Sequence, residues 1–195
     1  MIIDVSNTIG RHKFKAEITA ESLLQQMDAA GIDKAVISCY AESLDNESVY
    51  RAITAYPDRF IGLYTVNPWD KNAAAELEDA LANKGFKGLY MNPIRHGYML
   101  CEHEVFYPLL DVCRKHKAVV WCYGAAETFC LPVFFTAIAQ DYPDVNIILG
   151  RQGLNYDNAS AVEIARKNPN VYLDTSASMD FNARRAMKTS GVDKV

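Results

Sequence analysis

Seven short apolar runs, separated by longer amphipathic segments, constrain the fold of this chain more than any other sequence feature. The runs are continuously apolar and rich in Val, Ile and Leu, as strands covered on both faces should be. Between them lie segments with helical apolar spacing, such as Leu23, Leu24 and Met27 before a capping Gly31. The alternation predicts a parallel sheet with helices outside it. The expected strands are Ile2–Val5, Lys34–Cys39, Phe60–Val66, Gly88–Met91, Ala118–Cys122, Asn146–Leu149 and Val171–Asp174.

The length of the repeating unit fits a (β/α)8 TIM-type barrel, an α/β fold that needs about 250 residues. A chain of 195 residues then holds about seven units. Val-Asp-Lys-Val after Gly191 is similar to the segment from Ile32 to Val36, where a strand begins. We therefore predict one barrel domain over residues 1–195, truncated before its eighth strand and last helix. An open doubly wound sheet is the alternative, and free strand edges would favour a homo-oligomer.

The first strand carries polar residues at alternating positions, Asp4, Ser6 and Thr8. Because side chains alternate between the two faces of a strand, these three are expected to share one face. Polar side chains gathered where a buried strand ends predict that a ligand is bound there.

Composition excludes several classes of function. The net charge of −4, with dispersed basic residues, does not favour binding to nucleic acid. No apolar run is long enough for a membrane span, and no signal peptide precedes the first strand. The five cysteines form no CxxC pair, which fits a reducing compartment, so we expect a cytoplasmic protein.

Several segments, taken in order, resemble the amidohydrolase superfamily, in particular the amidohydrolase-related branch with aminocarboxymuconate-semialdehyde decarboxylase-like proteins. The resemblance implies a (β/α)8 barrel with its active site at the carboxyl ends of the strands. It also implies a divalent metal, usually zinc, that assists hydrolysis or decarboxylation. Its expected ligands are His-x-His of strand one, histidines of strands five and six, and an aspartate of strand eight. The segments are Asp4–Gly10, Leu24–Val36, Tyr56–Phe60, Gly85–Gly88, Val145–Leu149 and Asn170–Thr175.

This chain departs from the family at the metal positions. Ser6 and Thr8 stand in place of His-x-His, Cys122 in place of the strand-five histidine, and Arg151 in place of the strand-six histidine. Hydroxyl groups are poor zinc ligands, and a guanidinium has no lone pair to donate. The sequence therefore predicts a site with neither a metal nor another cofactor.

The same positions suit a small anionic ligand. Arg151 can grip a carboxylate or a phosphate with two hydrogen bonds. Ser6, Thr8, Tyr90 and Asn92 are its expected hydrogen-bonding partners, and the last two stand where many family members have Lys and His. We predict these five residues as the ligand-binding set.

Cys122 and Asp174 are the candidate catalytic residues. A nearby guanidinium would favour the thiolate of Cys122 as a nucleophile, although this side chain equally fits as a filler of space. Asp174 is placed to act as a base or to tie down the loop after its strand. Arg151 itself has an alternative role, an internal ion pair with Asp4 or Asp174.

Three functions follow from these patterns. In the first hypothesis the chain is a metal-independent hydrolase or carbon–carbon lyase of amidohydrolase ancestry that acts on a small carboxylated or phosphorylated compound. Alternatively it is a catalytically inactive relative, a pseudoenzyme that serves as a binding or non-catalytic subunit. The third hypothesis is a fragment of a longer enzyme. Since barrel folds host many chemistries, the fold alone does not choose among them.

Overall fold

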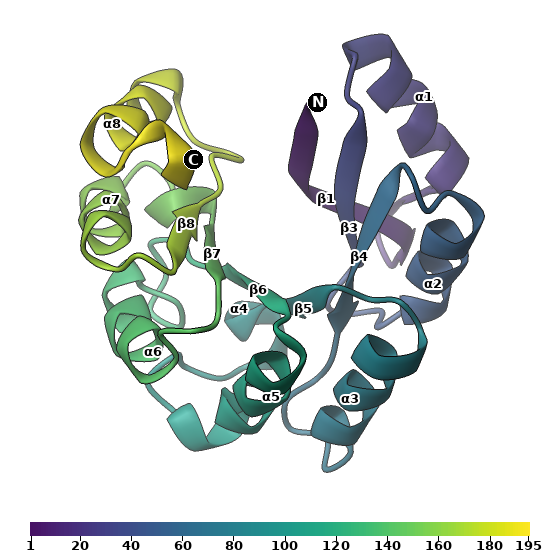
Figure 1. Cartoon of the computed structure of the whole chain (residues 1–195), viewed down its shortest axis with the longest axis horizontal. Coiled ribbons are helices and arrows are strands. Elements are labelled where there is room, and N and C mark those ends of the chain that lie inside the picture. Colours follow the sequence, from purple (N-terminus) through teal and green to yellow (C-terminus); the bar gives the residue numbers. More distant parts are fainter. The chain divides into compact units, whose positions relative to one another are not determined.

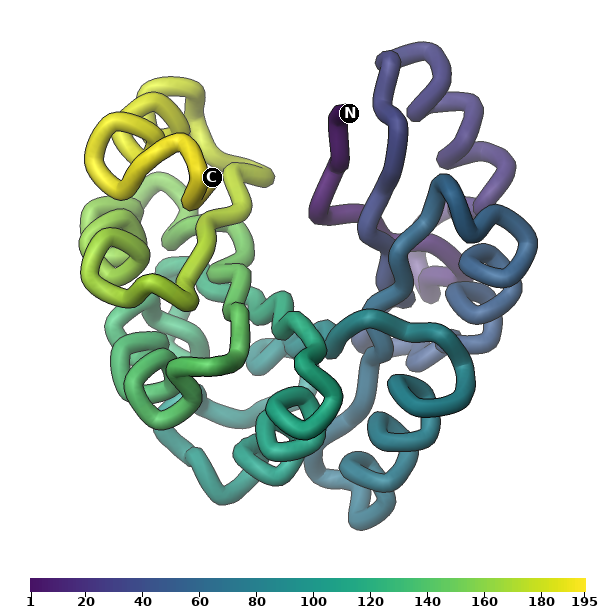
Figure 2. Tube along the Cα trace, in the orientation of Figure 1, coloured from purple at the N-terminus to yellow at the C-terminus, as the bar shows by residue number.

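The structure is a computed structural model that describes residues 1–195 and divides into two compact units, Met1–Tyr90 and Met91–Val195. Each unit combines strands with helices that pack against them, and Figure 2 follows the chain of each unit from strand to helix and back. No helix has the length and apolar character that crossing a lipid bilayer requires. The prediction of a single domain over residues 1–195 stays a prediction.

In the first unit the strands follow the order β2-β1-β3-β4-β5. All neighbouring pairs are parallel except β1 with β2, which form an antiparallel hairpin. The helices α1, α2 and α3 cover one face of the strands (Figure 1). The elements are β1 (Ile3–His12), β2 (Lys15–Ile18), α1 (Ala20–Ala30), β3 (Lys34–Cys39), α2 (Asn46–Ala55), β4 (Phe60–Thr65), α3 (Ala73–Asn83) and β5 (Gly88–Met91).

The sequence sets the limits of α1 by local chemistry. Thr19 and Ser22 form a capping box, in which each side chain accepts a hydrogen bond from the backbone of the other. At the other end Gly31 adopts the left-handed conformation, with φ of 68°. The buried Leu23 and Met27 of α1 then join the apolar core that β3 also lines. The core of this unit comprises Ile9, Leu23, Met27, Ala35, Ile37, Cys39, Val49, Ala52, Ile53, Phe60, Ala80 and Phe86.

In the second unit the parallel strands β6, β7 and β8 lie side by side in that order. The helices α6, α7 and α8 lie along one side of β7 and β8 (Figure 1). The elements are α4 (Pro93–His96), α5 (His103–His116), β6 (Val119–Tyr123), α6 (Phe135–Asp141), β7 (Ile147–Gly150), α7 (Asn158–Lys167), β8 (Val171–Leu173) and α8 (Asp180–Ser190). Short 3-10 turns occur at Pro132–Phe134, Arg151–Gly153 and Val192–Lys194.

Two buried residues fix the packing around β7. Gly150 leaves room for the Trp121 ring, which a Cβ atom at this position would overlap. Asn170 precedes β8 and donates hydrogen bonds from Nδ2 to the carbonyl oxygens of Ala139, Tyr142 and Val145, at 3.1, 2.9 and 3.2 Å. One amide group thereby satisfies carbonyls at the end of α6 and in the following loop, which have no partner within a helix.

The predicted strands are all present, but two predictions about the sheet were wrong. The first strand continues to His12 and turns back into β2, so Ser6 and Thr8 lie within a strand and not beyond its end. The segment after Gly191 forms a 3-10 turn and not the start of a strand. There the Lys194 ammonium lies over the Tyr172 ring, 4.6 Å from its centroid, so the turn packs against β8.

Candidate functional site

The register of the first unit places a row of polar side chains on one face of the sheet. Thr8 is directly opposite Ser38 on the neighbouring strand, and Thr65 is directly opposite Tyr90. Ile37 pairs with Gly62, so Ser38 and Thr65 point to the same side. Thr8 and Tyr90 were predicted as ligand-binding residues. Ser38 and Thr65 were not, because each follows an apolar run without a motif to mark it.

A β-bulge in β1 overturns the prediction that Asp4, Ser6 and Thr8 share one face. Asp4 pairs with Ala35, and the next paired residue, Asn7, pairs with Ile37. Three steps on one strand thus match two on the other, so Asp4 shares the face of Ala35 whereas Thr8 lies on the opposite one. The Asp4 carboxylate accepts a hydrogen bond from the backbone N–H of Ser6 at 3.2 Å, which closes the bulge locally.

In the second unit Arg151 follows β7 directly. Its guanidinium lies over the ring of Tyr123 at the end of β6, 5.1 Å from the ring centroid. Arg114, Arg166 and Arg184 are in ion pairs, whereas Arg151 is in no ion pair of this unit. The predicted alternative of an Arg151–Asp174 ion pair is therefore wrong, and this half-buried cation keeps its hydrogen-bond donors available for an anion.

Tyr123 and Glu127 accompany Arg151 and were missed in the sequence. Desolvation and the Glu127 carboxylate raise the pKa of the Tyr123 phenol, while the positive charge of Arg151 acts in the opposite direction. The phenol therefore stays protonated at neutral pH and can donate a hydrogen bond. Tyr123 is the last residue of β6 and pairs with Gly150, directly before Arg151, so only the pairing of β6 with β7 identifies it.

Asp174, after β8, is buried and occupied by local donors. Its carboxylate accepts hydrogen bonds from the Ser176 backbone N–H at 2.8 Å and from the Ser176 hydroxyl at 2.7 Å. The Arg151 backbone N–H lies 3.3 Å from Oδ2 as a third donor. This arrangement ties the loop after β8 to the turn after β7. Of the two roles predicted for Asp174, it corresponds to the structural one. The role as a base stays a prediction.

The environment of Cys122 favours a neutral thiol. Burial raises its pKa well above the ordinary value, and the charge that an ionised Cys130 would carry adds to this effect. The guanidinium of Arg151 contacts the ring of Tyr123 and not the sulfur atom of Cys122. The geometry therefore supports the space-filling alternative for Cys122, and its role as a nucleophile stays a prediction.

Asn92 caps the short helix α4, because its Oδ1 accepts a hydrogen bond from the backbone N–H of Arg95 at 3.2 Å. This role uses one oxygen lone pair, and its part in ligand binding is still a prediction. The predicted set is thus divided between the units, with Ser6, Thr8 and Tyr90 in one and Asn92, Cys122, Arg151 and Asp174 in the other.

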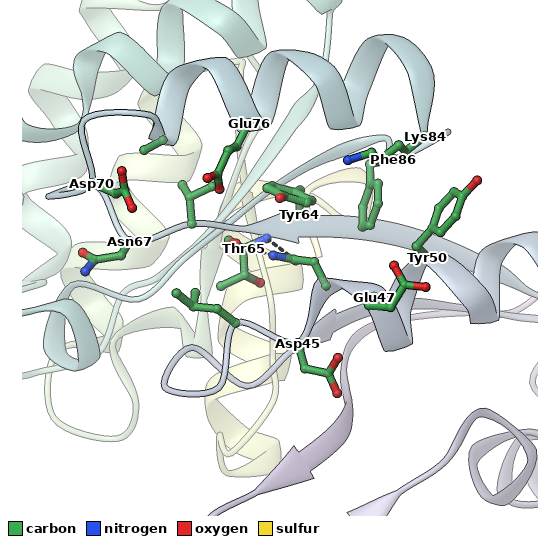
Figure 3. A pocket seen from close by; sticks show the side chains of 14 residues that line it. Asp45, Glu47, Tyr50, Tyr64, Thr65, Asn67, Asp70, Glu76, Lys84 and Phe86 are labelled. Atoms are coloured by element: carbon green, nitrogen blue, oxygen red, sulfur yellow. Dashed lines mark hydrogen bonds between the residues drawn. The ribbon is translucent and has the colours of Figure 1, made fainter.

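A cavity of about 390 Å³ lies in the first unit and involves none of the predicted residues. Figure 3 shows carboxylates of α2 and α3 around the rings of Tyr64 and Phe86, which meet edge to face at 5.1 Å. The one cation in its wall, Lys84, is paired with Asp79 at 2.8 Å. The lining residues are Leu44, Asp45, Asn46, Glu47, Tyr50, Tyr64, Thr65, Val66, Asn67, Asp70, Ala73, Glu76, Lys84 and Phe86.

The sequence profile of the family Amidohydro_2, described as Amidohydrolase, matches residues 10–194. The chain belongs to this family. No curated protein matches it. Membership agrees with the resemblance to the amidohydrolase superfamily, and the match begins after Ser6 and Thr8.

Solved structures share the fold at low sequence identity. A manganese-bound 5-carboxyvanillate decarboxylase from Novosphingobium aromaticivorans has a TM-score of 0.78 and 18% identity, and the alignment covers 100% of this chain and 85% of that one. The corresponding enzyme from Sphingomonas paucimobilis gives 0.71 and 15%, with coverages of 100% and 86%. A 4-oxalomesaconate hydratase from Rhodopseudomonas palustris gives 0.69 and 17%, with 100% and 80%. The fold of this amidohydrolase-family chain is accordingly the α/β TIM-barrel type.

The residues present do not fit the metal that the family resemblance implies. No group of three or more His, Cys, Asp or Glu side chains is arranged to hold a metal ion. At the end of β7 a guanidinium stands where an imidazole ligand is expected, and a fixed positive charge there would repel a divalent cation. The chain therefore shares the family and the barrel fold, but it lacks the residues that would hold the metal.

Proposed function

We propose that this amidohydrolase-family chain binds a small carboxylate-bearing ligand at the carboxyl end of β7 without a divalent metal. The observation that carries the proposal is the position of Arg151, half-buried over Tyr123 and outside every ion pair of its unit. The planar array of donors of a guanidinium matches a carboxylate, with which it forms two parallel hydrogen bonds. The ring of Tyr123 holds the guanidinium in place by a cation–π contact.

The names of the structural neighbours support a carboxylate over a phosphate. The two decarboxylases act on 5-carboxyvanillate and the hydratase on 4-oxalomesaconate, and both names denote carboxylated compounds. Together with the family match, these neighbours support a lineage of hydrolases, decarboxylases and hydratases.

A second candidate function is that of a binding or non-catalytic subunit. It is favoured by the state of the two predicted catalytic groups. Asp174 is occupied by the donors of Ser176, and Cys122 is held as a neutral thiol. Ligand binding at Arg151 is common to both candidates, so it is the property to test first.

Isothermal titration calorimetry with citrate, and separately with inorganic phosphate, tests the proposal on protein treated with EDTA. We expect citrate to bind without added metal, and Arg151→Met to weaken binding at least about tenfold because it removes a charged hydrogen-bonding partner. Arg184→Met is the matched control, since Arg184 is exposed and paired only with Asp180. Phosphate bound more tightly than citrate would contradict the carboxylate assignment. Citrate binding that requires Mn²⁺ or Zn²⁺ would contradict the metal-free site.

A further inference from the structure

The turn that carries Arg151 has positive φ angles at four consecutive residues, three of which carry a Cβ atom. The φ angles are positive at Arg151 (60°), Gln152 (35°), Gly153 (74°) and Leu154 (51°), and only one of these residues is glycine. Leu154 combines its φ with a ψ of −139°, a region that residues with a Cβ atom rarely enter. A turn that only connected β7 to α7 could use glycine or asparagine at these positions without this cost.

Buried polar contacts hold the turn in this conformation. Gln152 is fully buried, and its Nε2 donates a hydrogen bond to the Ser178 hydroxyl at 2.9 Å. Its backbone carbonyl accepts a hydrogen bond from Asn158 Nδ2 at 3.3 Å. The N–H of Gly153 donates to the Gly124 carbonyl at 2.8 Å, which links the turn to the end of β6. Strain persists only where the surroundings over-determine a conformation, and these contacts do so.

Arg151 is fixed at both ends of its side chain. At the backbone its N–H faces Asp174 Oδ2 at 3.3 Å, and its carbonyl accepts the N–H of Leu154 at 2.7 Å. At the other end the guanidinium lies over the Tyr123 ring. A long side chain that is ordered before binding loses less conformational entropy when the ligand arrives.

We propose that the strained turn Arg151–Leu154 is a pre-organising device for the anion, with Leu154 as a positioning residue. The inference rests on the proposed function, because it concerns the same guanidinium. The buried contacts of Gln152 hold the turn in the conformation that presents Arg151, and the Cβ atom of Leu154 limits the other conformations into which the backbone could relax. Strain in the turn is therefore retained for binding and not for stability.

Leu154→Gly tests this inference because glycine enters the same conformation without strain but also leaves it freely. We expect an unfolding midpoint no lower than that of the wild type, together with a Kd for citrate about tenfold higher and a less favourable binding entropy. Leu154→Ala keeps the Cβ atom and is expected to bind citrate as the wild type does. Lys117→Gly is the matched control, since it relieves a positive φ of 53° at the end of α5 and is expected to leave the affinity unchanged.

The results separate this inference from the proposed function. If Arg151→Met weakens citrate binding and Leu154→Gly does not, the pre-organising role is refuted and the anion site stands. Equal losses of affinity in Leu154→Ala and Leu154→Gly would also refute it, because side-chain packing would then be responsible. If Arg151→Met binds citrate as the wild type does, the proposed function itself fails.

Discussion

Raising the pH above 9 is expected to destabilise this fold through its buried thiols. Burial raises the pKa of Cys39 from 9.0 to about 11 and that of Cys113 to about 12, and it raises the pKa of Cys122 well above 9.0. The unfolded chain therefore loses these protons at a lower pH than the folded protein does. The stability that the neutral thiols contribute is complete below pH 9 and is lost as the pH rises towards 11 to 12.

The size of the loss follows from the ionisation of the unfolded state. At pH 10 an unfolded thiol is ionised about ten to one while a buried one is still protonated, which corresponds to ~1.4 kcal/mol per thiol. For Cys39, Cys113 and Cys122 together the loss is about 4 kcal/mol. Domains are stable by about 5–15 kcal/mol, so a loss of this size is measurable.

Urea unfolding at pH 8 and pH 10 measures this loss as the difference between two free energies of unfolding. Cys113→Ala creates a cavity and lowers stability at both pH values, but the difference between them should shrink by ~1.4 kcal/mol. Cys101→Ala is the matched control, since Cys101 is exposed, and it should leave the difference unchanged. The reasoning is refuted if Cys113→Ala shows the same pH dependence as the wild type.

Thermal unfolding checks three further predictions. Gly150→Ala should cost ~1–3 kcal/mol through overlap with Trp121, more than the ~1 kcal/mol for Gly31→Ala, where no atom lies within 4 Å and only the positive φ resists. Asn170→Ala should cost ~2 kcal/mol, because the carbonyl oxygens of Ala139 and Val145 lose their side-chain donor, while that of Tyr142 keeps the Val145 N–H; a smaller loss would mean that water replaces the amide. The Asp45 carboxylate caps α2 by accepting a hydrogen bond from the Ser48 N–H at 3.2 Å. Asp45→Ala removes this cap and should lower the free energy of unfolding by ~1 kcal/mol.

The parallel strands were predictable because local sequence determines them. Lys34–Cys39 and Gly88–Met91 are observed with the predicted limits. Both are apolar runs next to helix-ending signals, so the local sequence is sufficient to set the first and last residue of each strand. The hairpin of β1 and β2 was missed because Lys15–Ile18 is short and exposed on three of its four residues. Its pairing depends on the neighbouring strand and not on an apolar pattern of its own.

The site was less predictable, because side-chain partners depend on register and on burial. One extra residue in β1 moves Asp4 to the other face from Thr8, and no composition rule announces a bulge. Arg151 was identified correctly as the end of a strand, but its neighbour Tyr123 emerges only from the pairing of β6 with β7. The positive φ angles after β7 were equally hidden, since Gln152 and Leu154 are not residues that mark left-handed turns.

When arginine replaces a metal ligand at the end of a strand, one chemical property of the metal site is kept and another is lost. A divalent metal both attracts a carboxylate and activates water as a Lewis acid. A guanidinium keeps the first property, with one positive charge and directed hydrogen bonds, but it cannot lower the pKa of a bound water by coordination. Under the proposed function Arg151 preserves the recognition of an anion, and any catalysis would have to come from groups such as Tyr123, Glu127 and Asp174. The proposal therefore separates carboxylate binding, which Arg151→Met tests, from the turnover of a substrate, which needs a measurement of its own.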